Sequence, residues 1–291
     1  MRQFQFAGGI SPARRRQDKL FKSVCFIGIL TACLFLIVLL WSVGKDGVDR
    51  INGDFFTSFA SRFPDKAGIK ASLWGSLWVI VVAIVVAVPV GVAAAVYLEV
   101  FTSSRNKLAS FIQLNIANLA GVPSIVYGLL GLALFVRALS LDRSVLAGGL
   151  TLAILVLPMI IVVSQEAIKA VPRLYTEGSL ALGATKWQTV FRQVLPAALP
   201  GIITGIILSV SRAMGETAPL ITIGAVSVIR QVPDGLDSKF TVLPMQIYDW
   251  STRPQAGFHD AAAAAIIVLV GMLLLLNSAA IVIRARSQKK V

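Results

Sequence analysis

Apolar residues in this chain are gathered into long, almost uncharged runs that are separated by polar stretches. A helix needs roughly 20 apolar residues to cross the hydrocarbon core of a bilayer. Six runs meet or approach that length: about residues 23–43, 71–98, 108–136, 145–165, 193–221 and 261–283. The runs do not alternate as barrel strands do, and a backbone in lipid must satisfy its own hydrogen bonds. We therefore expect an all-α integral membrane protein with six transmembrane helices.

The polar stretches differ in charge according to the side of the membrane that they would occupy. Six spans place both termini on one side, where the segments carry 16 Lys/Arg against 4 Asp/Glu: residues 1–22, 99–110, 165–192 and 284–291. The opposite loops carry 10 Lys/Arg and 9 Asp/Glu: residues 44–70, 137–144 and 222–260. The positive-inside rule therefore places both termini in the cytoplasm. The net charge of +13 follows this orientation, so it indicates a lipid bilayer and not nucleic acid as the partner.

These boundaries predict one transmembrane domain with short basic ends. The domain covers residues 23–283, with basic cytoplasmic tails at 1–22 and 284–291, a cytoplasmic loop at 166–193 and an outer loop at 222–260. The two cysteines, Cys25 and Cys33, lie in the first span without a metal-site pattern, so we expect them to serve packing. The chain has no G-x-x-x-x-G-K-[ST] motif, no H-E-x-x-H motif and no nucleophile elbow. We therefore predict no enzymatic activity, no metal site and no cofactor bound by this chain.

The cytoplasmic loop after the fourth run carries the signals of two short helices. Pro172 suits a first helical turn, Gly183 suits a left-handed stop, and Thr185 with Gln188 forms a capping-box pattern. The second helix should end where Leu195-Pro196 begins the next span. Apolar residues lie among the polar ones, which leaves two interpretations: a hairpin that covers the base of the bundle, or a docking element for a cytoplasmic partner.

The fifth run carries two charges, although a charge near mid-membrane costs roughly 2.5–3.5 kcal/mol on insertion scales. Arg212 and Glu216 are four residues apart, so in a continuous helix they share a face and can pair. At 100° per residue, that face is a stripe about 120° wide. It contains Gly201, Gly205, Ser209, Arg212, Ala213 and Glu216. Because small residues allow helices to approach closely, we expect the pair to face the bundle interior or a partner subunit.

The charged pair has two interpretations. One is a buried ion pair that fixes the register of the helix. The other is an anion gate, in which the planar guanidinium of Arg212 binds phosphate or sulfate oxygens. Glu216 would then hold Arg212 when no substrate is present. Loss of uptake on replacing Arg212 with alanine distinguishes the gate from the structural pair.

The third run contains polar and helix-breaking residues at membrane depth. They are Asn115, Asn118, Gly121 and Pro123. Proline removes one backbone hydrogen bond, which predicts a kink or a break in this helix. We assign Pro123 and Pro219 as hinges. We assign five residues to the substrate pathway: Arg212, Glu216, Ser209, Ser124 and Asn118.

Three segments resemble the motifs of phosphate-specific ABC permeases. They are SRAMGETAPL at 211–220, AGVPSIVYG at 120–128, and GATKW at 183–187 followed by LPAALPG at 195–201. The spacing from Glu177 through Gly183 to Leu195-Pro196 also resembles the "EAA" loop of ABC importer permeases, with Gly178-Ser179 in place of the two alanines and Gln193 in place of an isoleucine. In that family the loop forms the coupling helix that contacts the ATPase. The resemblance therefore assigns ATPase coupling to Arg173, Glu177, Gly183, Thr185 and Trp187.

The resemblance implies the type I ABC importer permease architecture and ATP-driven import of phosphate across the bacterial cytoplasmic (inner) membrane. Length and the short N-terminal tail favour the PstA-type permease over its PstC-type partner. The implied partners are that second permease, two ATP-binding cassette ATPase subunits that bind ATP and Mg²⁺, and an extracytoplasmic phosphate-binding protein. The alternatives are a permease for another oxyanion, such as molybdate or sulfate, and a secondary anion transporter that needs no ATPase.

Overall fold

The computed structural model describes residues 12–102, 106–225 and 228–288, which form helices joined by loops. In this part of the chain, five helices are long and apolar enough to cross a membrane, and a bent pair of helices is a sixth candidate span. The elements are α1 (Pro12–Gly47), η1 (Val48–Arg50), α2 (Gly53–Thr57), η2 (Pro64–Lys66), α3 (Lys70–Val96), η3 (Tyr97–Phe101), α4 (Lys107–Ala120), α5 (Ser124–Gly131), η4 (Leu132–Ala138), α6 (Val145–Lys169), α7 (Arg173–Ala181), α8 (Lys186–Thr189), η5 (Val190–Val194), α9 (Leu195–Gly215), α10 (Ala218–Thr222), α11 (Leu243–Ser251) and α12 (Ala256–Gln288). The predicted all-α membrane fold is confirmed.

The centre of the bundle is α6, which packs against α3 on one side and α9 on another. Glycines make both approaches close. A Cβ at Gly91 would lie 2.6 Å from the Ile160 side chain, and a Cβ at Gly205 would overlap Val163. Buried aliphatic residues from the three helices form two clusters along these contacts. Small residues on α9 therefore serve close packing, as the stripe predicted, and the helix that they meet belongs to the same chain.

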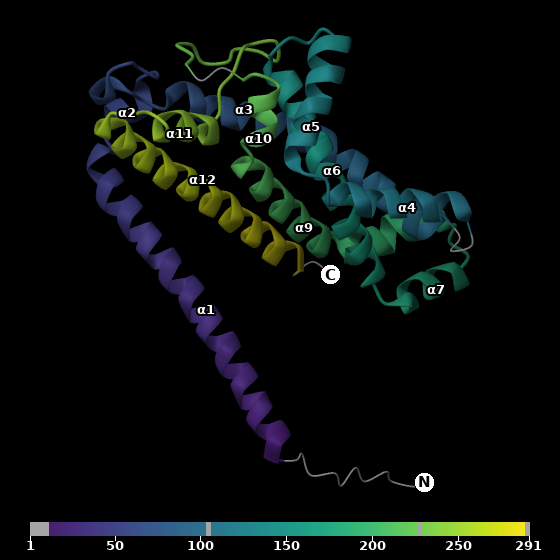
Figure 1. Cartoon of the computed structure of the whole chain (residues 1–291). Helices are drawn as coiled ribbons and strands as arrows, with labels where there is room; N and C mark the ends of the chain where they lie inside the picture. The colour runs from purple at the N-terminus through teal and green to yellow at the C-terminus, as the bar shows by residue number, and fades with distance from the viewer. Residues whose placement is uncertain (1–11, 103–105, 226–227, 289–291) are drawn as a thin grey trace.

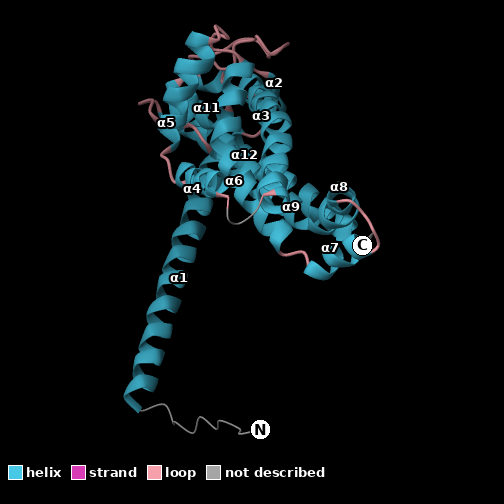
Figure 2. Cartoon of the chain, turned by 90° about the vertical axis from the view of Figure 1, so that its right-hand side faces the viewer, coloured by secondary structure: helices cyan, strands magenta, loops and turns pink. Residues whose placement is uncertain are grey.

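The outer loop predicted at 222–260 contains a packed helix, α11. Its Trp250 is fully buried in a cluster with Phe55 and Phe258. A second part of this loop lies along the start of α6, where the Val145 amide donates to the Ser238 carbonyl over 3.0 Å. This packed end, with α2 and α11, lies opposite α7 in both views of the molecule (Figure 1, Figure 2).

Helix α1 projects away from the bundle (Figure 1, Figure 2). It meets α12 at Gly47, where a Cβ would lie 2.6 Å from the Ala264 backbone nitrogen. Along the rest of its length α1 buries none of its apolar span within the chain. Cys25 and Cys33 are exposed in the described chain, so the expectation that they serve packing stays a prediction for a neighbour outside it. An isolated apolar pattern does not specify which neighbour covers it.

The segments predicted as basic tails overlap the ends of two helices. The structure begins α1 at Pro12, so residues 12–22 belong to a helix. At the other end α12 continues to Gln288, past the predicted boundary at residue 283. Residues 1–11 and 289–291 lie outside the described part of the chain. Charged residues do not stop a helix that leaves the membrane, because they have helix propensities close to those of apolar residues.

Candidate functional site: two interrupted spans and a cytoplasmic helical segment

The third span is broken at the predicted position. Helix α4 ends at Ala120, α5 begins at Ser124, and the two arms are bent by 105°. Pro123 lies between them with an extended backbone (φ −55°, ψ 136°). Proline has no amide hydrogen, and its ring clashes with the carbonyl four residues back, so α4 cannot continue through this position. The prediction of a break at Pro123 is confirmed, whereas its use as a moving hinge stays a prediction.

The fifth span is also broken, and this corrects the predicted helix through residue 221. Helix α9 ends at Gly215, and Glu216 has an extended backbone (ψ 118°). The short helix α10 then starts at Ala218. The cause lies at Pro219, four residues after Gly215, because proline cannot donate to the Gly215 carbonyl and its ring displaces that carbonyl. Arg212 and Glu216 therefore do not share a continuous helix face.

Arg212 and Glu216 nevertheless remain paired. The Arg212 Nε lies 3.5 Å from the Glu216 Oε1, a distance of ionic contact longer than a good hydrogen bond. Within this chain 58% of the Arg212 side chain is exposed, against 19% of the Glu216 side chain. The pair is thus not sealed inside the chain, and the guanidinium retains donors that can reach a ligand.

A cavity of about 230 Å³ brings Arg212 next to the break in the third span. Its wall is formed by Leu119, Ala120, Val122, Ser124, Tyr127, Leu155, Val156, Met159 and Arg212. Arg212 is the one charged residue in this lining, and Ser124 contributes a hydroxyl from the first turn of α5. No side chain caps the N-terminus of α5, so its first amides keep the partial positive charge of a helix start. A positive group among apolar walls and hydroxyls is a favourable environment for a small anion.

Three residues that the sequence assigned to the pathway do not line this cavity: Glu216, which pairs with Arg212 beside it, and Ser209 and Asn118, which lie elsewhere. Ser209 is fully buried on α9, and its hydroxyl donates to the Gly205 carbonyl over 2.9 Å. Asn118 is exposed on α4, one turn before the break, and its carbonyl accepts a hydrogen bond from the Gly121 amide. The structure brings Ser124 and Arg212 together and leaves the other three outside the lining of their cavity. Their assignment to the substrate pathway stays a prediction.

Sequence reasoning missed Tyr127, which lines the cavity and is almost completely buried. Its hydroxyl donates to the Leu119 carbonyl across the break over 2.7 Å. A signal was present in the sequence. A phenol in an apolar run, four residues after a helix-breaking proline, can supply the backbone partner that the proline removes.

The segment that the sequence predicts to be cytoplasmic forms the two predicted helices, α7 and α8. Pro172 precedes α7 as its N-cap, and Gly183 has a left-handed backbone (φ 82°) after its end. The capping box is also formed. The Gln188 amide donates to the Thr185 hydroxyl over 3.2 Å, and the Thr185 amide donates to the Gln188 side chain over 2.9 Å. The predicted helix–turn–helix is therefore confirmed by its own capping groups.

The second of these helices is continuous with the fifth span, which corrects the predicted separation at Leu195-Pro196. The helical segment runs from Lys186 to Gly215 without interruption through α8, η5 and α9. A π-helical turn at Val190–Val194 precedes Pro196. There the Leu195 amide donates to the Val190 carbonyl five residues back. This wider turn lets the helix pass a residue that has no amide hydrogen.

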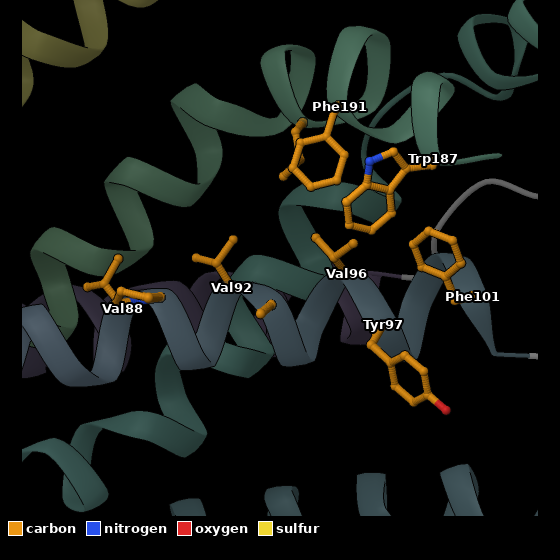
Figure 3. A pocket seen from close by; sticks show the side chains of 10 residues that line it. Val88, Val92, Val96, Tyr97, Phe101, Trp187 and Phe191 are labelled. Atoms are coloured by element: carbon orange, nitrogen blue, oxygen red, sulfur yellow. The ribbon is translucent and has the colours of Figure 1, made fainter. Parts of the chain in front are cut away.

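The exposed apolar residues of the segment fall into two groups. Leu174 and Leu182 are 78% and 90% exposed. Trp187 and Phe191 instead line an apolar groove of about 440 Å³ against the end of α3 (Figure 3). The Trp187 ring centroid lies 6.1 Å from that of Phe101 and 4.4 Å from that of Phe191. The first group is available to another protein, whereas the second joins the segment to the membrane domain.

The remaining residues assigned to coupling lie on the surface of the segment. Arg173 lines a polar cavity of about 520 Å³ together with Glu99, Lys169 and Thr176. Lys169 bridges Glu166 over 3.1 Å and Glu99 over 3.8 Å, which links the end of α6 to η3. Glu177, Gly183 and Thr185 are exposed. The structure thus gathers the assigned residues at one end of the molecule, and their contact with an ATPase stays a prediction.

Two interrupted spans and a protruding helical segment define a multi-pass α-helical membrane protein with a cavity that Arg212 lines between its candidate spans. The model of the family described as binding-protein-dependent transport system inner membrane component matches residues 87–291. The chain belongs to this family. The matched part contains the cavity and the α7–α8 segment.

Relatives in sequence include permeases with curated names. The chain is 34% identical over 251 residues to the phosphate transport system permease protein PstA 1 of Mycobacterium tuberculosis (strain ATCC 25618 / H37Rv), with 84% of this chain and 80% of that protein covered. It is 26% identical over 249 residues to the phosphate transport system permease protein PstA of Haemophilus influenzae, with 86% and 87% covered. The chain is therefore similar in sequence to PstA-type permeases over most of its length.

Solved structures agree with the fold. A bacterial ABC transporter involved in the import of alginate matches with a TM-score of 0.62 at 17% identity, covering 93% of this chain and 96% of that chain. The MetNI methionine ABC transporter in an inward-facing conformation matches with a TM-score of 0.60 at 21% identity, covering 76% and 94%. The predicted type I ABC importer permease architecture is therefore confirmed as the fold of this chain.

Proposed function

We propose that this chain is one of two permease subunits of an ATP-driven phosphate importer in the bacterial cytoplasmic membrane. The proposed partners are a second, PstC-type permease, two ATP-binding cassette ATPase subunits and an extracytoplasmic phosphate-binding protein. One observation carries the proposal: Arg212, an arginine at membrane depth, is half exposed in a cavity at the break of another span. Glu216 contacts the Nε of this guanidinium, and an anion in transit is a partner of the right charge for the donors that the pair leaves available.

The chemistry of the cavity suits an oxyanion. The guanidinium of Arg212 presents parallel N–H donors that match two oxygens of a tetrahedral anion. Ser124 adds a hydroxyl, and the uncapped start of α5 adds partial positive charge. Glu216 neutralises Arg212 between transport events and repels a trapped anion. The site therefore favours passage over tight binding.

The choice of phosphate among oxyanions is supported by the names of the relatives, which are phosphate transport permeases. Sulfate and molybdate share the tetrahedral shape and would meet the same guanidinium. Competition decides between them. Excess unlabelled phosphate should suppress uptake of labelled phosphate, and equal sulfate or molybdate should not.

Uptake of phosphate into a cell requires energy. Moving a dianion into a compartment that is negative inside costs about 4.6 kcal/mol per 100 mV, from about 2.3 kcal/mol per charge. Because the chain contains no phosphate-binding loop motif, the proposal assigns ATP and Mg²⁺ to the partner ATPase. In this proposal the permease forms the transport route, and ATP hydrolysis by the ATPase provides the free energy.

The continuous α8–α9 helix connects the segment proposed to contact the ATPase with the cavity of Arg212. A continuous helix of 30 residues, Lys186–Gly215, spans about 45 Å at 1.5 Å per residue. It carries Trp187 near one end and Arg212 near the other. A push on the α7–α8 segment therefore displaces Arg212 directly, and alternating access follows if the displacement opens one side of the cavity and closes the other.

Uptake by the reconstituted importer tests the proposal. Proteoliposomes containing the full complex receive ATP inside and the phosphate-loaded binding protein outside. Arg212→Ala should lower uptake at least about 10-fold, the effect of losing a charge-assisted hydrogen bond worth about 1.5–3 kcal/mol. Arg212→Lys should fall between this variant and wild type, because it keeps the charge and loses the planar fork. Glu216→Gln, which removes the negative charge that pairs with Arg212, is measured beside these two variants.

Two controls separate a lost passage from a lost complex. Arg62→Ala removes an exposed arginine before the second span and should transport normally. ATP hydrolysis stimulated by the loaded binding protein should persist in Arg212→Ala, because the coupling segment is intact. Wild-type uptake by Arg212→Ala would refute the proposed passage. Uptake without ATP and without any ATPase would favour a secondary transporter instead.

A further inference from the structure

The hydrogen bond of Tyr127 is the starting observation. The Tyr127 side chain is 6% exposed, and its hydroxyl donates over 2.7 Å to the Leu119 carbonyl in the last turn of α4. The same carbonyl accepts the Val122 amide over 3.0 Å. A carbonyl at the end of a helix has lost its partner four residues on. The Val122 amide is one donor to this carbonyl, and Tyr127 supplies a second one from the other arm of the bend, where lipid offers none.

The residue that follows Tyr127 fixes α5 from another direction. A Cβ at Gly128 would overlap the Thr222 hydroxyl and the Pro219 backbone of α10. Helix α5 is therefore packed against α10 through Gly128 and bonded to α4 through Tyr127. The two interrupted spans meet at this pair of residues. Because α10 follows Glu216 directly in the chain, the contact lies close to the charged pair.

Tyr127 also lies one helical turn from Ser124, and both line the cavity of Arg212. The bend between α4 and α5 decides where the first turn of α5 lies relative to α9. We propose that Tyr127 is a positioning residue: its hydroxyl bond to the Leu119 carbonyl holds the α4–α5 bend that keeps Ser124 in the cavity of Arg212 during phosphate transport. This inference rests on the proposed function of that cavity.

Tyr127→Phe tests the inference, because it removes the hydroxyl and keeps the ring that packs. The variant is made in the complete importer, with Tyr248→Phe, an exposed tyrosine on α11, as the matched control. The first readout is the number of phosphate ions imported per ATP hydrolysed. A purely structural defect lowers transport and hydrolysis together and leaves this ratio unchanged. Mispositioning of the cavity should lower the ratio by about 3- to 10-fold, the range for one lost hydrogen bond.

The second readout is spectroscopic and independent of phosphate. Spin labels at the exposed positions 114 on α4 and 130 on α5 report the bend, in a background where both native cysteines are replaced. Tyr127→Phe should broaden or shift the distance distribution between the labels, and Tyr248→Phe should leave it as in wild type.

The outcomes separate this inference from the proposed function. A changed bend with a lowered ratio supports the inference. An unchanged bend overturns it, and so does a changed bend with the wild-type ratio. Arg212→Ala, measured in the same preparation, reports whether the cavity is the phosphate route at all. If Arg212→Ala transports normally, the proposed route fails, while the label distances still show whether Tyr127 holds the bend.

Discussion

The cavity of Arg212 and the α7–α8 segment both contain side chains whose polarity does not match their surroundings. Arg212 is a charge among apolar walls, whereas Leu174 and Leu182 are apolar side chains exposed on a polar segment. Each arrangement is unfavourable for the chain alone and becomes favourable with a partner. A charged ligand satisfies the first, and an apolar protein groove satisfies the second. The comparison teaches that α7 with its following residue Leu182, and the Arg212 end of α9, suit partners of different chemistry.

The packing around the cavity of Arg212, the first of the two regions, is tested most severely at Gly128. Gly128→Ala should disturb the contact of α5 with α10, because the added methyl group overlaps Thr222 and Pro219. Overpacking of this kind costs typically 1–3 kcal/mol. Thermal unfolding of the purified protein in detergent should show a lower midpoint. Gly271→Ala is the matched control, since nothing lies within 4 Å of its added group. Equal stability of the two variants would show that the interrupted spans are not packed as described.

Replacement of the exposed leucines addresses the coupling end alone. Leu174→Ser with Leu182→Ser should weaken association with the ATPase about 10-fold or more, if these side chains act as interface hot spots worth about 2 kcal/mol. Co-purification and ATP hydrolysis measure this effect, and the thermal midpoint should not change, because both side chains are exposed. Leu236→Ser, in the outer loop, serves as the control. Undiminished ATPase association would show that Leu174 and Leu182 do not contact the ATPase.

Substitution of Trp187 separates two proposed functions of the α7–α8 segment: binding of the ATPase and transmission of its motion to the membrane domain. Trp187→Ala removes the ring between Phe101 and Phe191 and should lower the phosphate imported per ATP by a few-fold. The ATPase should remain bound, because this ring lines the groove against α3 and is separate from the exposed Leu174 and Leu182. Trp187→Phe keeps an aromatic ring and should transport close to wild type, since aromatic contacts are worth about 0.5–1.5 kcal/mol. Loss of the ATPase from Trp187→Ala would assign Trp187 to the ATPase interface instead.

The smallest effect is expected at Ser211, the neighbour of Arg212. Its hydroxyl lies 2.6 Å from the Asn277 side chain of α12, on another face of α9. Ser211→Ala should lower stability by about 0.6 kcal/mol, the average for hydrogen bonds between membrane helices. Uptake should remain near wild type. A loss of uptake as large as that of Arg212→Ala would mean that the route runs on the α12 side of α9.

Local sequence rules predicted most of the fold, the break at Pro123 beside the cavity and the turn between α7 and α8. Apolar runs located the spans, Pro123 located the break, and Gly183 with Thr185 located the turn of the coupling segment. Each of these features depends on a few neighbouring residues. The 105° bend of the third span is not predictable from local rules, because its second arm packs through Gly128 against Pro219 and Thr222, which lie far along the chain.

Two errors arose from single prolines. Pro196 was interpreted as the start of a span, but the π-helical turn at Val190–Val194 carries the helix past it. Pro219 is assigned as a hinge, but the predicted span still continues through it to residue 221, whereas the structure ends α9 at Gly215 and places Glu216 outside the helix. The second error was avoidable, since the spacing of four residues between Gly215 and Pro219 is visible in the sequence. The first depends on a backbone choice that residue types do not determine.

Cysteine labelling tests the central claim that Arg212 faces the route of an anion. Arg212→Cys is prepared in the complete importer, with the exposed Cys25 and Cys33 replaced. A negatively charged thiol reagent should modify this cysteine, and phosphate delivered by the binding protein under turnover should slow the modification. A cysteine that never reacts, or one that reacts at the same rate with and without phosphate, would contradict the account.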